Sequence, residues 1–496
     1  MNRPSATRHR VSATRGPRRA RLALALATAL LAGACAVGPD YREPTPALDA
    51  SFVNAPAAVN PASADIAAFW RGFGDADLTA LIERGLAANG DVRIAQARLQ
   101  ESRAILQGTR AEQFPNVGVA ADAGRTLTSE FQLPGASRSQ RTTSFYDAGF
   151  TASWELDFFG RNRRASESAA AQLDASQAGV HAAQTIVAAE VARNYLELRG
   201  LQLRLAVARD SIVNQRESLR LTRARLDAGR GTQLDVARAQ TQLAGTEAIL
   251  PTLQTAIDRS GYRIATLVAE PLRDVAARLA TPRLLPTLPV TDLSALPLGT
   301  PEQLLRRRPD LVQSERQLAA ATAHIGVATA DLFPRINLVG LIGFATNQLS
   351  GFGQSTSQQY SVAAGLTWPL LDFGRVRSRI SASEARALQA LAGYEQTVAI
   401  ALEETEGALS QFSHSAEQTD KLAIAAGSAE QAARLSKLRF DAGAVDFLIV
   451  LDAERQSLVA RDALVLAQVG QATALVSVYR ALGGGWSEAP AAVAAK

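Results

Sequence analysis

The chain repeats itself, because three short motifs of its first half recur in the same order in its second half. Residues 111–115 (AEQFP), 154–161 (WELDFFGR) and 225–229 (RLDAG) recur as 330–334 (ADLFP), 368–375 (WPLLDFGR) and 439–443 (RFDAG). A period of roughly 200 residues is far longer than the ~20–50 residues of solenoid repeats. The sequence therefore predicts a duplicated unit, in which both halves share one plan.

Each half contains a stretch in which apolar residues alternate with smaller or polar ones. The apolar members are Tyr146, Ala148, Phe150, Ala152, Trp154 and Leu156 in the first half, and Tyr360, Val362, Ala364, Leu366, Trp368 and Leu370 in the second. Alternation over about eleven residues predicts a strand with one apolar face, at the length of a tilted membrane strand. A half-buried strand of a soluble sandwich has the same pattern, so both interpretations stay open here.

A second, less regular strand is expected before each of these, at 116–125 and 335–345, with polar loops at 128–144 and 346–359. Four strands cannot close a barrel, and open sheet edges are not tolerated in lipid. If the strands span a membrane, several copies must share one barrel, with eight strands from two copies or twelve from three.

Two long helices are predicted, because no proline interrupts 161–226 or 375–440, and each run would form about 100 Å of helix. Heptad spacing marks the first run and the segment after its turn: Val191, Leu198, Leu205, Ile212, Leu219, Leu226, then Val236, Leu243, Leu250, Ile257, Ile264. Sustained heptads predict coiled-coil packing. Pro251 is expected to kink the first return helix. Strand pairs fused to helices of this length favour a barrel on a helical stalk.

Tight turns join the long helices to their return helices. Gly229 and Gly443 end the long helices, where a left-handed residue closes the last turn. Thr232 with Asp235 has the pattern of a capping box, and Asp446 takes the equivalent N-cap place in the second half.

Two acidic residues, Asp227 and Asp441, stand in the last turn of the long helices, where the helix dipole disfavours negative charge by about 0.3–1 kcal/mol. This unfavourable placement occurs in both halves. We hypothesise that the two carboxylates dock a basic partner; the alternative is that they pair with Arg225 and Arg439.

The N-terminus has the layout of a secretory signal over residues 1–34: arginines, a largely apolar run at 22–32, and small residues before a cleavage site. The apolar run is too short to span a bilayer. The formal charge of +5 comes from 52 basic and 47 acidic residues. Removing the signal's seven arginines leaves 45 basic residues, a net charge of about −2, so the mature chain gives no reason to expect a nucleic-acid partner.

The only cysteine, Cys35, follows this signal directly, where a bacterial lipoprotein carries its acylated thiol. Residues 31–35 (LAGAC) match such a lipobox imperfectly, since Ala32 stands where leucine is usual; simple cleavage after Ala34 is the alternative. By its resemblance to bacterial lipoproteins, Ala36 in place of aspartate implies sorting to the outer membrane. With one cysteine and four scattered histidines, the sequence predicts neither a metal site nor a cofactor. It contains no phosphate-binding loop and no hydrolase motif, so it does not predict an enzyme.

Residues 35–41 (CAVGPDY) and the doubled motifs together resemble the TolC-like outer-membrane factor family, and within it the NodT-type lipoproteins of efflux pumps. The resemblance implies an α+β membrane protein of the outer membrane: a homotrimer that shares one 12-stranded β-barrel, four strands per chain, on a long periplasmic α-helical coiled-coil barrel. It also implies two partners, an inner-membrane RND-type pump and a periplasmic adaptor that meets the helical tips, and no cofactor. The function expected is passive efflux of small molecules.

The domain division expected follows the repeat. It comprises a signal peptide at 1–34, a lipidated N-terminal and equatorial segment at 35–76, repeat 1 at 77–269, an equatorial linker at 270–300, repeat 2 at 301–484 and a flexible tail at 485–496.

By the same resemblance, Leu448 and Asp452 match the positions that narrow the tunnel at its periplasmic end. They are four residues apart and share a helix face, and three copies of Asp452 would form an acidic ring. The alternative is a surface Asp452 paired with Arg455 or Lys437.

Two other functions share some of these features. The exit duct of a type I protein secretion system has the same architecture, although the lipoprotein start favours small-molecule efflux. A periplasmic coiled-coil adaptor anchored only by lipid is a further alternative.

Overall fold

The computed structural model describes residues 36–54, 66–295 and 298–484. The expected signal peptide, Cys35 and the tail at 485–496 lie outside these ranges. The chain forms two compact units. Among the described residues, the sheet unit contains 36–42, 104–171 and 318–389, and the helical unit contains 43–54, 66–103, 172–295, 298–317 and 390–484.

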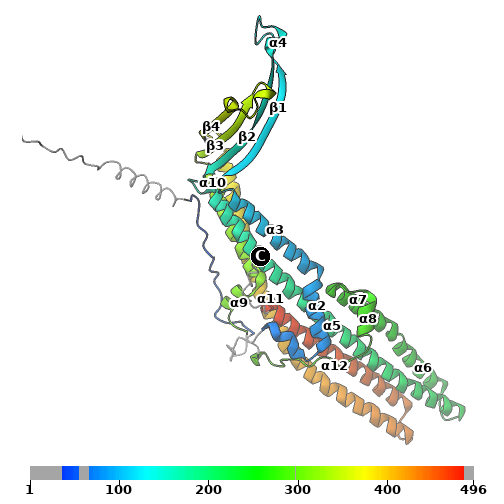
Figure 1. Ribbon diagram of the computed structural model, residues 1–496. Coiled ribbons are helices and arrows are strands. Elements are labelled where there is room, and N and C mark those ends of the chain that lie inside the picture. Colours follow the sequence, from blue (N-terminus) through cyan, green and yellow to red (C-terminus); the bar gives the residue numbers. More distant parts are fainter. Residues whose placement is uncertain (1–35, 55–65, 296–297, 485–496) are drawn as a thin grey trace, which may run out of the picture. The chain divides into compact units, whose positions relative to one another are not determined.

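The sheet unit holds one four-stranded antiparallel sheet in the order β1-β2-β3-β4 (Figure 1). Its strands are β1 (Asn116–Leu127), β2 (Thr142–Leu156), β3 (Arg335–Thr346) and β4 (Gln358–Thr367). β1 and β4 each have one unpaired edge among the described residues. The four predicted strands are therefore confirmed, in two adjacent pairs that come from the two halves of the chain.

One face of the sheet is apolar across all four strands. Phe150 lies opposite Val119 and Ile342, and Ile342 lies opposite Tyr360; residues directly opposite each other share a face. The large apolar residues of this face are exposed, among them Val117, Val119, Phe150, Ile342, Tyr360, Val362 and Leu366. A soluble sandwich would bury such a face, so the exposed band favours the membrane interpretation of the alternating pattern.

The other face carries Asp122 opposite Asp147 and is concave where Gly149 lies opposite Gly343. A Cβ on Gly343 would lie 2.3 Å from the carbonyl oxygen of Ala148, and one on Gly149 would lie 2.6 Å from that of Ile342. No larger residue fits there, as is typical of a tight bend in a barrel sheet. The sheet therefore curves toward its more polar face.

Strand boundaries differ from the prediction: β2 begins at Thr142, inside the predicted loop, and β4 ends earlier than expected. The alternation in the second half continues to Leu371, but β4 ends at Thr367. Thr367 pairs with Arg335, the first residue of β3, so no partner strand remains beyond it. Pro369 also has no N–H to donate to a ladder.

The two predicted long helices are α5 (Arg161–Asp227) and α11 (Arg375–Asp441), each 67 residues long. Before the strands lie α2 (Ala76–Ala88), α3 (Gly90–Ala111), α9 (Pro301–Arg307) and α10 (Pro309–Ala330). Short elements complete the fold: α4 (Arg138–Arg141), α8 (Leu272–Leu279) and the 3₁₀ helices at Ile66–Phe73, Leu293–Ala295, Leu349–Gly351 and Ser355–Ser357.

The two return helices differ because of one proline. In the first half the return path is broken into α6 (Gln233–Glu247) and α7 (Ile249–Val268), with Ala248 between them. Pro251 cannot donate the N–H that would bond the carbonyl of Glu247, which accounts for the break and confirms the predicted interruption. In the second half, α12 (Phe447–Ala481) is unbroken.

The heptad residues pack as predicted within the helical unit. Val191, Leu198, Ile212 and Leu219 of α5 are all buried, as is Leu243 of α6. The largest apolar cluster includes Tyr195 and Tyr479. The ring of Tyr479 stacks on that of Phe69, with 4.8 Å between the ring centroids.

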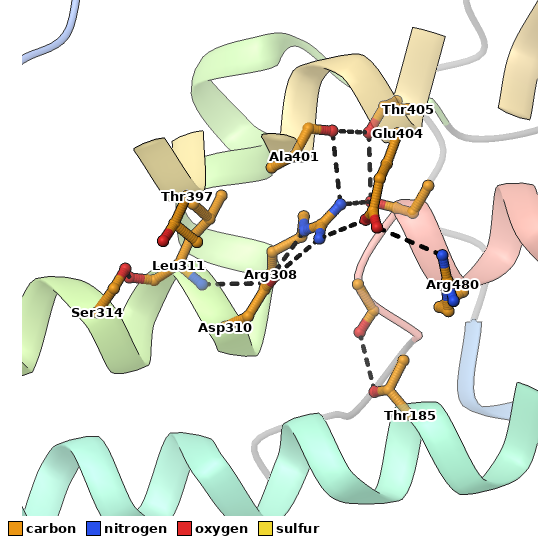
Figure 2. A network of polar contacts seen from close by, with 12 residues as sticks. Thr185, Arg308, Asp310, Leu311, Ser314, Thr397, Ala401, Glu404, Thr405 and Arg480 are labelled. Atoms are coloured by element: carbon orange, nitrogen blue, oxygen red, sulfur yellow. Dashed lines mark hydrogen bonds and ion pairs between the residues drawn. The ribbon is translucent and has the colours of Figure 1, made fainter. Parts of the chain in front are cut away.

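A buried arginine joins three segments of the helical unit (Figure 2). Arg308 forms a bidentate pair with Asp310, with N···O distances of 3.0 and 2.6 Å, and also donates to Glu404 at 2.8 Å. Glu404 also accepts a hydrogen bond from Arg480 of α12. Burial alone would lower the pKa of Arg308, but the two carboxylates outweigh it and raise the pKa. Such a network fixes the geometry of the helices more than it stabilises the fold.

Candidate functional site

The two tight turns at the far ends of α5 and α11 have the same backbone geometry. Gly229 and Gly443 have φ of 68° and 73°. The next residues donate backwards, Arg230 N to the carbonyl of Arg225 and Ala444 N to that of Arg439, both at 2.8 Å. These are Schellman bonds, and they end each long helix at the predicted glycine.

Side chains start each return helix as predicted. Thr232 Oγ1 accepts from Asp235 N at 3.2 Å, and Asp235 Oδ2 accepts from Thr232 N at 3.1 Å. Asp446 Oδ1 accepts from Leu448 N at 2.9 Å. The capping roles are therefore confirmed, whereas contact of these residues with an adaptor stays a prediction.

Asp227 and Asp441 are both exposed at the turns, and among the described residues neither forms an ion pair. Arg225 is engaged elsewhere: its guanidinium carbon lies 3.8 Å from the ring centroid of Phe440, and Nη2 donates to the carbonyl of Phe440. Both carboxylates are thus available to a partner.

Leu448 and Asp452 share one face of α12 and each is 49% exposed. Asp452 accepts from Arg455 at 2.9 Å and from Gln456 at 2.7 Å, so the expected alternative pairing with Arg455 forms within the single chain. Both residues line a groove of about 760 Å³ between α12 and α6, opposite Leu234 and Arg238.

A polar layer inside the helices was missed by the sequence analysis. Gln215 of α5 is only 3% exposed, and neither of its side-chain polar atoms has a hydrogen-bond partner. Glu454 of α12 accepts from Ser218 at 2.8 Å through Oε1, while its Oε2 has no partner. Burial raises the pKa of Glu454, against the effects of Ser218 and Lys437.

The heptads contain the signal for this layer. Gln215 follows the heptad residue Ile212 by three residues. Leu451, Leu458 and Val465 also recur every seven residues, and Glu454 follows Leu451 by three, so both polar residues stand at seam positions that are usually apolar. Glu454 lies on the same helix as Leu448 and Asp452, on its buried side.

The repeated motifs meet where the strands join the helices in the sheet unit. The indole N–H of Trp154 donates to the carbonyl of Gln113 at 3.0 Å, and that of Trp368 donates to the carbonyl of Leu332 at the same distance. Both carbonyls directly precede a Phe-Pro pair. The tryptophan of each half therefore binds the end of the helix that precedes its strands.

The acidic residue of the same motif caps the long helix. Asp157 accepts from the backbone of Asn162 and Arg163. Asp372 accepts from Val376 and Gly374, and these bonds lower its pKa. The conserved spacing within the repeat thus has a structural cause in each half.

Two further properties of the described residues bear on other functions. No group of three or more His, Cys, Asp or Glu side chains there could hold a metal ion. One helix, α12, is long and apolar enough to cross a membrane by length and composition, but 44% of its most apolar window is buried within the fold. It is a packed helix of the helical unit.

The chain is similar to known proteins along nearly its whole length. The family model described as "Outer membrane efflux protein" matches residues 81–270 and 300–484. Outer membrane protein OprJ of Pseudomonas aeruginosa is 33% identical over 94% of this chain and 96% of its own. Nodulation protein T of Rhizobium leguminosarum bv. trifolii is 30% identical over 92% and 96%. The solved outer-membrane channel OprN is 40% identical, covers 91% of this chain and 100% of its own, and has a TM-score of 0.85.

Proposed function

Because this chain belongs to the outer membrane efflux protein family, we propose that it is the outer-membrane channel of a tripartite efflux pump. It is a passive conduit from the periplasm to the exterior: an RND-type inner-membrane pump supplies the energy, and a periplasmic adaptor opens the helical tips. The family is of a non-enzymatic conduit type. The observation that carries the proposal is one chain that combines an open, lipid-compatible sheet with two 67-residue helices.

The open sheet explains why the channel needs several copies of the chain. β1 and β4 have free edges, and in lipid every backbone group must be paired within protein. Three copies of the four strands close one 12-stranded barrel, with the exposed apolar face toward lipid and the concave face toward the lumen. A lipid-anchored adaptor has no use for such a sheet, and the family match spans both repeats.

The two matched segments of the family support the domain division expected from the repeat. The family match leaves out residues 271–299, and we propose that 270–300 is the linker between the repeats. The signal at 1–34 and the tail at 485–496 stay predictions.

The function is tested in a strain that lacks the gene. We expect these cells to accumulate more of a fluorescent efflux dye than the parent, and the full chain to restore export. A chain lacking β4 (Gln358–Thr367) should not restore it, because the barrel cannot close. Normal dye export combined with loss of a secreted protein would instead identify the exit duct of a type I secretion system.

We propose that the adaptor docks at the turns through Asp227 and Asp441. Their exposure, and the absence of any ion pair to them among the described residues, support this role. Gly229, Thr232, Gly443 and Asp446 shape the surface around them and complete the proposed contact.

Reversing both charges, Asp227→Arg with Asp441→Arg, should abolish co-purification of the adaptor and dye export. The control is Glu417→Arg with Asp420→Arg, a reversal of two exposed charges within α11. If the tip variant still binds the adaptor and exports dye, the docking proposal is wrong.

We propose that Leu448 and Asp452 form the periplasmic gate, a role supported by their exposure beside the groove between α6 and α12.

We also propose that Cys35 is acylated. Mass spectrometry of the N-terminal peptide of the mature protein tests this, since an acylated cysteine adds the mass of its lipid and a free thiol adds none.

A further inference from the structure

The segment directly after Cys35 is held against the sheet unit at a strand–helix junction. Val37 N donates to the carbonyl of Phe159 at 3.2 Å, and Phe159 lies between the end of β2 and the start of α5. Tyr41 packs against the buried alanines Ala171, Ala319 and Ala320 of α5 and α10. All of these residues belong to the same compact unit.

Arg164, on the first turn of α5, binds this segment through hydrogen bonds and an ion pair. The residue is 5% exposed. Its guanidinium donates to the carbonyl oxygens of Val37 and Gly38, at 3.2 and 3.4 Å, and to Asp40 Oδ1 at 2.6 Å. The remaining nitrogen donates to Glu167 at 2.8 Å. A buried guanidinium whose donors are used in this way holds its partners in one geometry.

Glycines allow the backbone of the segment to approach the unit closely. A Cβ on Gly38 would lie 2.4 Å from the Cα of Gly326, and Gly38 itself has a φ of 91°. A Cβ on Gly160 would lie 2.7 Å from the Cα of Ala36. Side chains larger than hydrogen are excluded at these contacts, so residues 36–40 pack against the unit in one defined position.

We propose that Arg164, with Gly38, Gly160 and Gly326, forms an N-terminal clasp that fixes where the acylated end of the chain enters the membrane. Ala36, the residue after Cys35 in the sequence, lies against Gly160 at the junction. This inference rests on the proposed acylation of Cys35. Arg164 is a positioning residue, and the clasp makes the anchor and the barrel one membrane-bound body.

The junction lies at the end of the sheet where α3, α5, α10 and α11 join the strands. β1 and β3 begin after α3 and α10, and β2 and β4 end before α5 and α11, whereas only loops and short helical turns join the strands at the other end (Figure 1). In an outer-membrane barrel with a periplasmic helical part, the helix-bearing end faces the periplasm. The clasp therefore delivers the acyl chains to the periplasm-facing leaflet beside the barrel.

The experiment places a nitroxide spin label on Pro39→Cys of the full chain, reconstituted in phosphatidylethanolamine–phosphatidylglycerol vesicles. Pro39 is exposed within the clasped segment. We expect an immobilised spectrum at headgroup depth, measured by relaxation with lipid-soluble oxygen and a water-soluble nickel chelate. Arg164→Gln should abolish the immobilised component, and Arg110→Gln, an exposed arginine of α3, should leave it unchanged.

Asp40→Asn is the second variant, because its exposed carboxylate contributes to the clasp without filling the core. It should mobilise the label even if Arg164→Gln yields no folded trimer. Three results would contradict the clasp: a mobile label in the Pro39→Cys chain without further substitution, the same mobility in both variants, or a label in the aqueous phase away from the bilayer.

Acylation is read separately in the same preparation. Cys35 is the only native cysteine, so an acylated parent chain without Pro39→Cys takes up no label. If the parent chain takes up label, Cys35 carries no lipid, and the membrane part of the inference is wrong. The efflux function is unaffected by that outcome, since dye export is measured independently.

Discussion

Gln215 and Glu454 bring polar atoms into a seam that is otherwise apolar. Three of their side-chain polar atoms have no partner among the described residues, and unsatisfied buried groups cost free energy. Glu454 lies two residues beyond Asp452 on α12, so its position in the seam is tied to the proposed gate. We interpret the layer as a weak point at which α12 can separate from α5.

Neutralising Glu454 should stabilise the helices at neutral and high pH. The pKa of this carboxyl is raised by burial, so its ionised form opposes folding above the folded-state pKa. The penalty fades as pH falls toward the unfolded-state value, and each unit of elevation costs about 1.4 kcal/mol. Glu454→Gln should raise the melting temperature at pH 8 and leave it unchanged at pH 4, as measured by circular dichroism.

Glu430→Gln is the matched control, since Glu430 is an exposed residue of α11 that lines the same hollow as Glu454. Equal effects of the two substitutions, or a Glu454→Gln effect that is the same at both pH values, would contradict this account of the layer.

At the scale of the elements, α12 determines the gate. Leu448→Ala with Asp452→Ala should widen the periplasmic entrance and raise single-channel conductance several-fold in planar bilayers. Leu466→Ala provides the control, because Leu466 is also 49% exposed on α12 but lies outside the groove. Unchanged conductance in the double variant would remove both residues from the gate.

The bend of the sheet depends on the glycine pair between β2 and β3. Gly343→Val places a side chain where a Cβ alone lies 2.3 Å from a carbonyl oxygen, so we expect strong loss of heat-modifiable trimer on gels. Overpacking costs about 1–3 kcal/mol or more where the backbone cannot move. Gly365→Val is the control on the same face, since its nearest neighbour is 3.9 Å away. Equal trimer yields would show that the bend does not need Gly343.

Elements with local signals were predicted closely. The proline-free run and heptads at 161–226 became α5, one residue longer, because a helix needs only its own backbone and a packed stripe. β4 was predicted too long because a strand ends where its pairing partner ends, and the alternation within one segment does not show which residues of another strand it pairs with.

Sites built from distant segments were not predictable. The clasp joins residues 36–40 to Arg164 and Gly326, and nothing in the local sequence distinguishes these from an ordinary helical arginine or glycine. The N-caps at the tips, by contrast, depend on residues two or three apart, and Thr232 with Asp235 was recognised directly. Glu454 stood within a visible heptad, so its burial was readable in principle.

At the scale of the whole molecule, the single chain is incomplete. Its sheet leaves one edge free on β1 and one on β4, and its apolar face is exposed across all four strands. Both defects disappear when copies share a barrel, because each β4 then pairs with the β1 of the next copy and lipid covers the apolar face.

The most direct test of the account is the conductance of the purified protein in planar bilayers, together with its mass by native mass spectrometry in detergent. We expect a complex of three chains that inserts and produces discrete current steps. A monomer or dimer, or a trimer that binds lipid but passes no current even with Leu448→Ala and Asp452→Ala, would contradict a shared barrel that conducts.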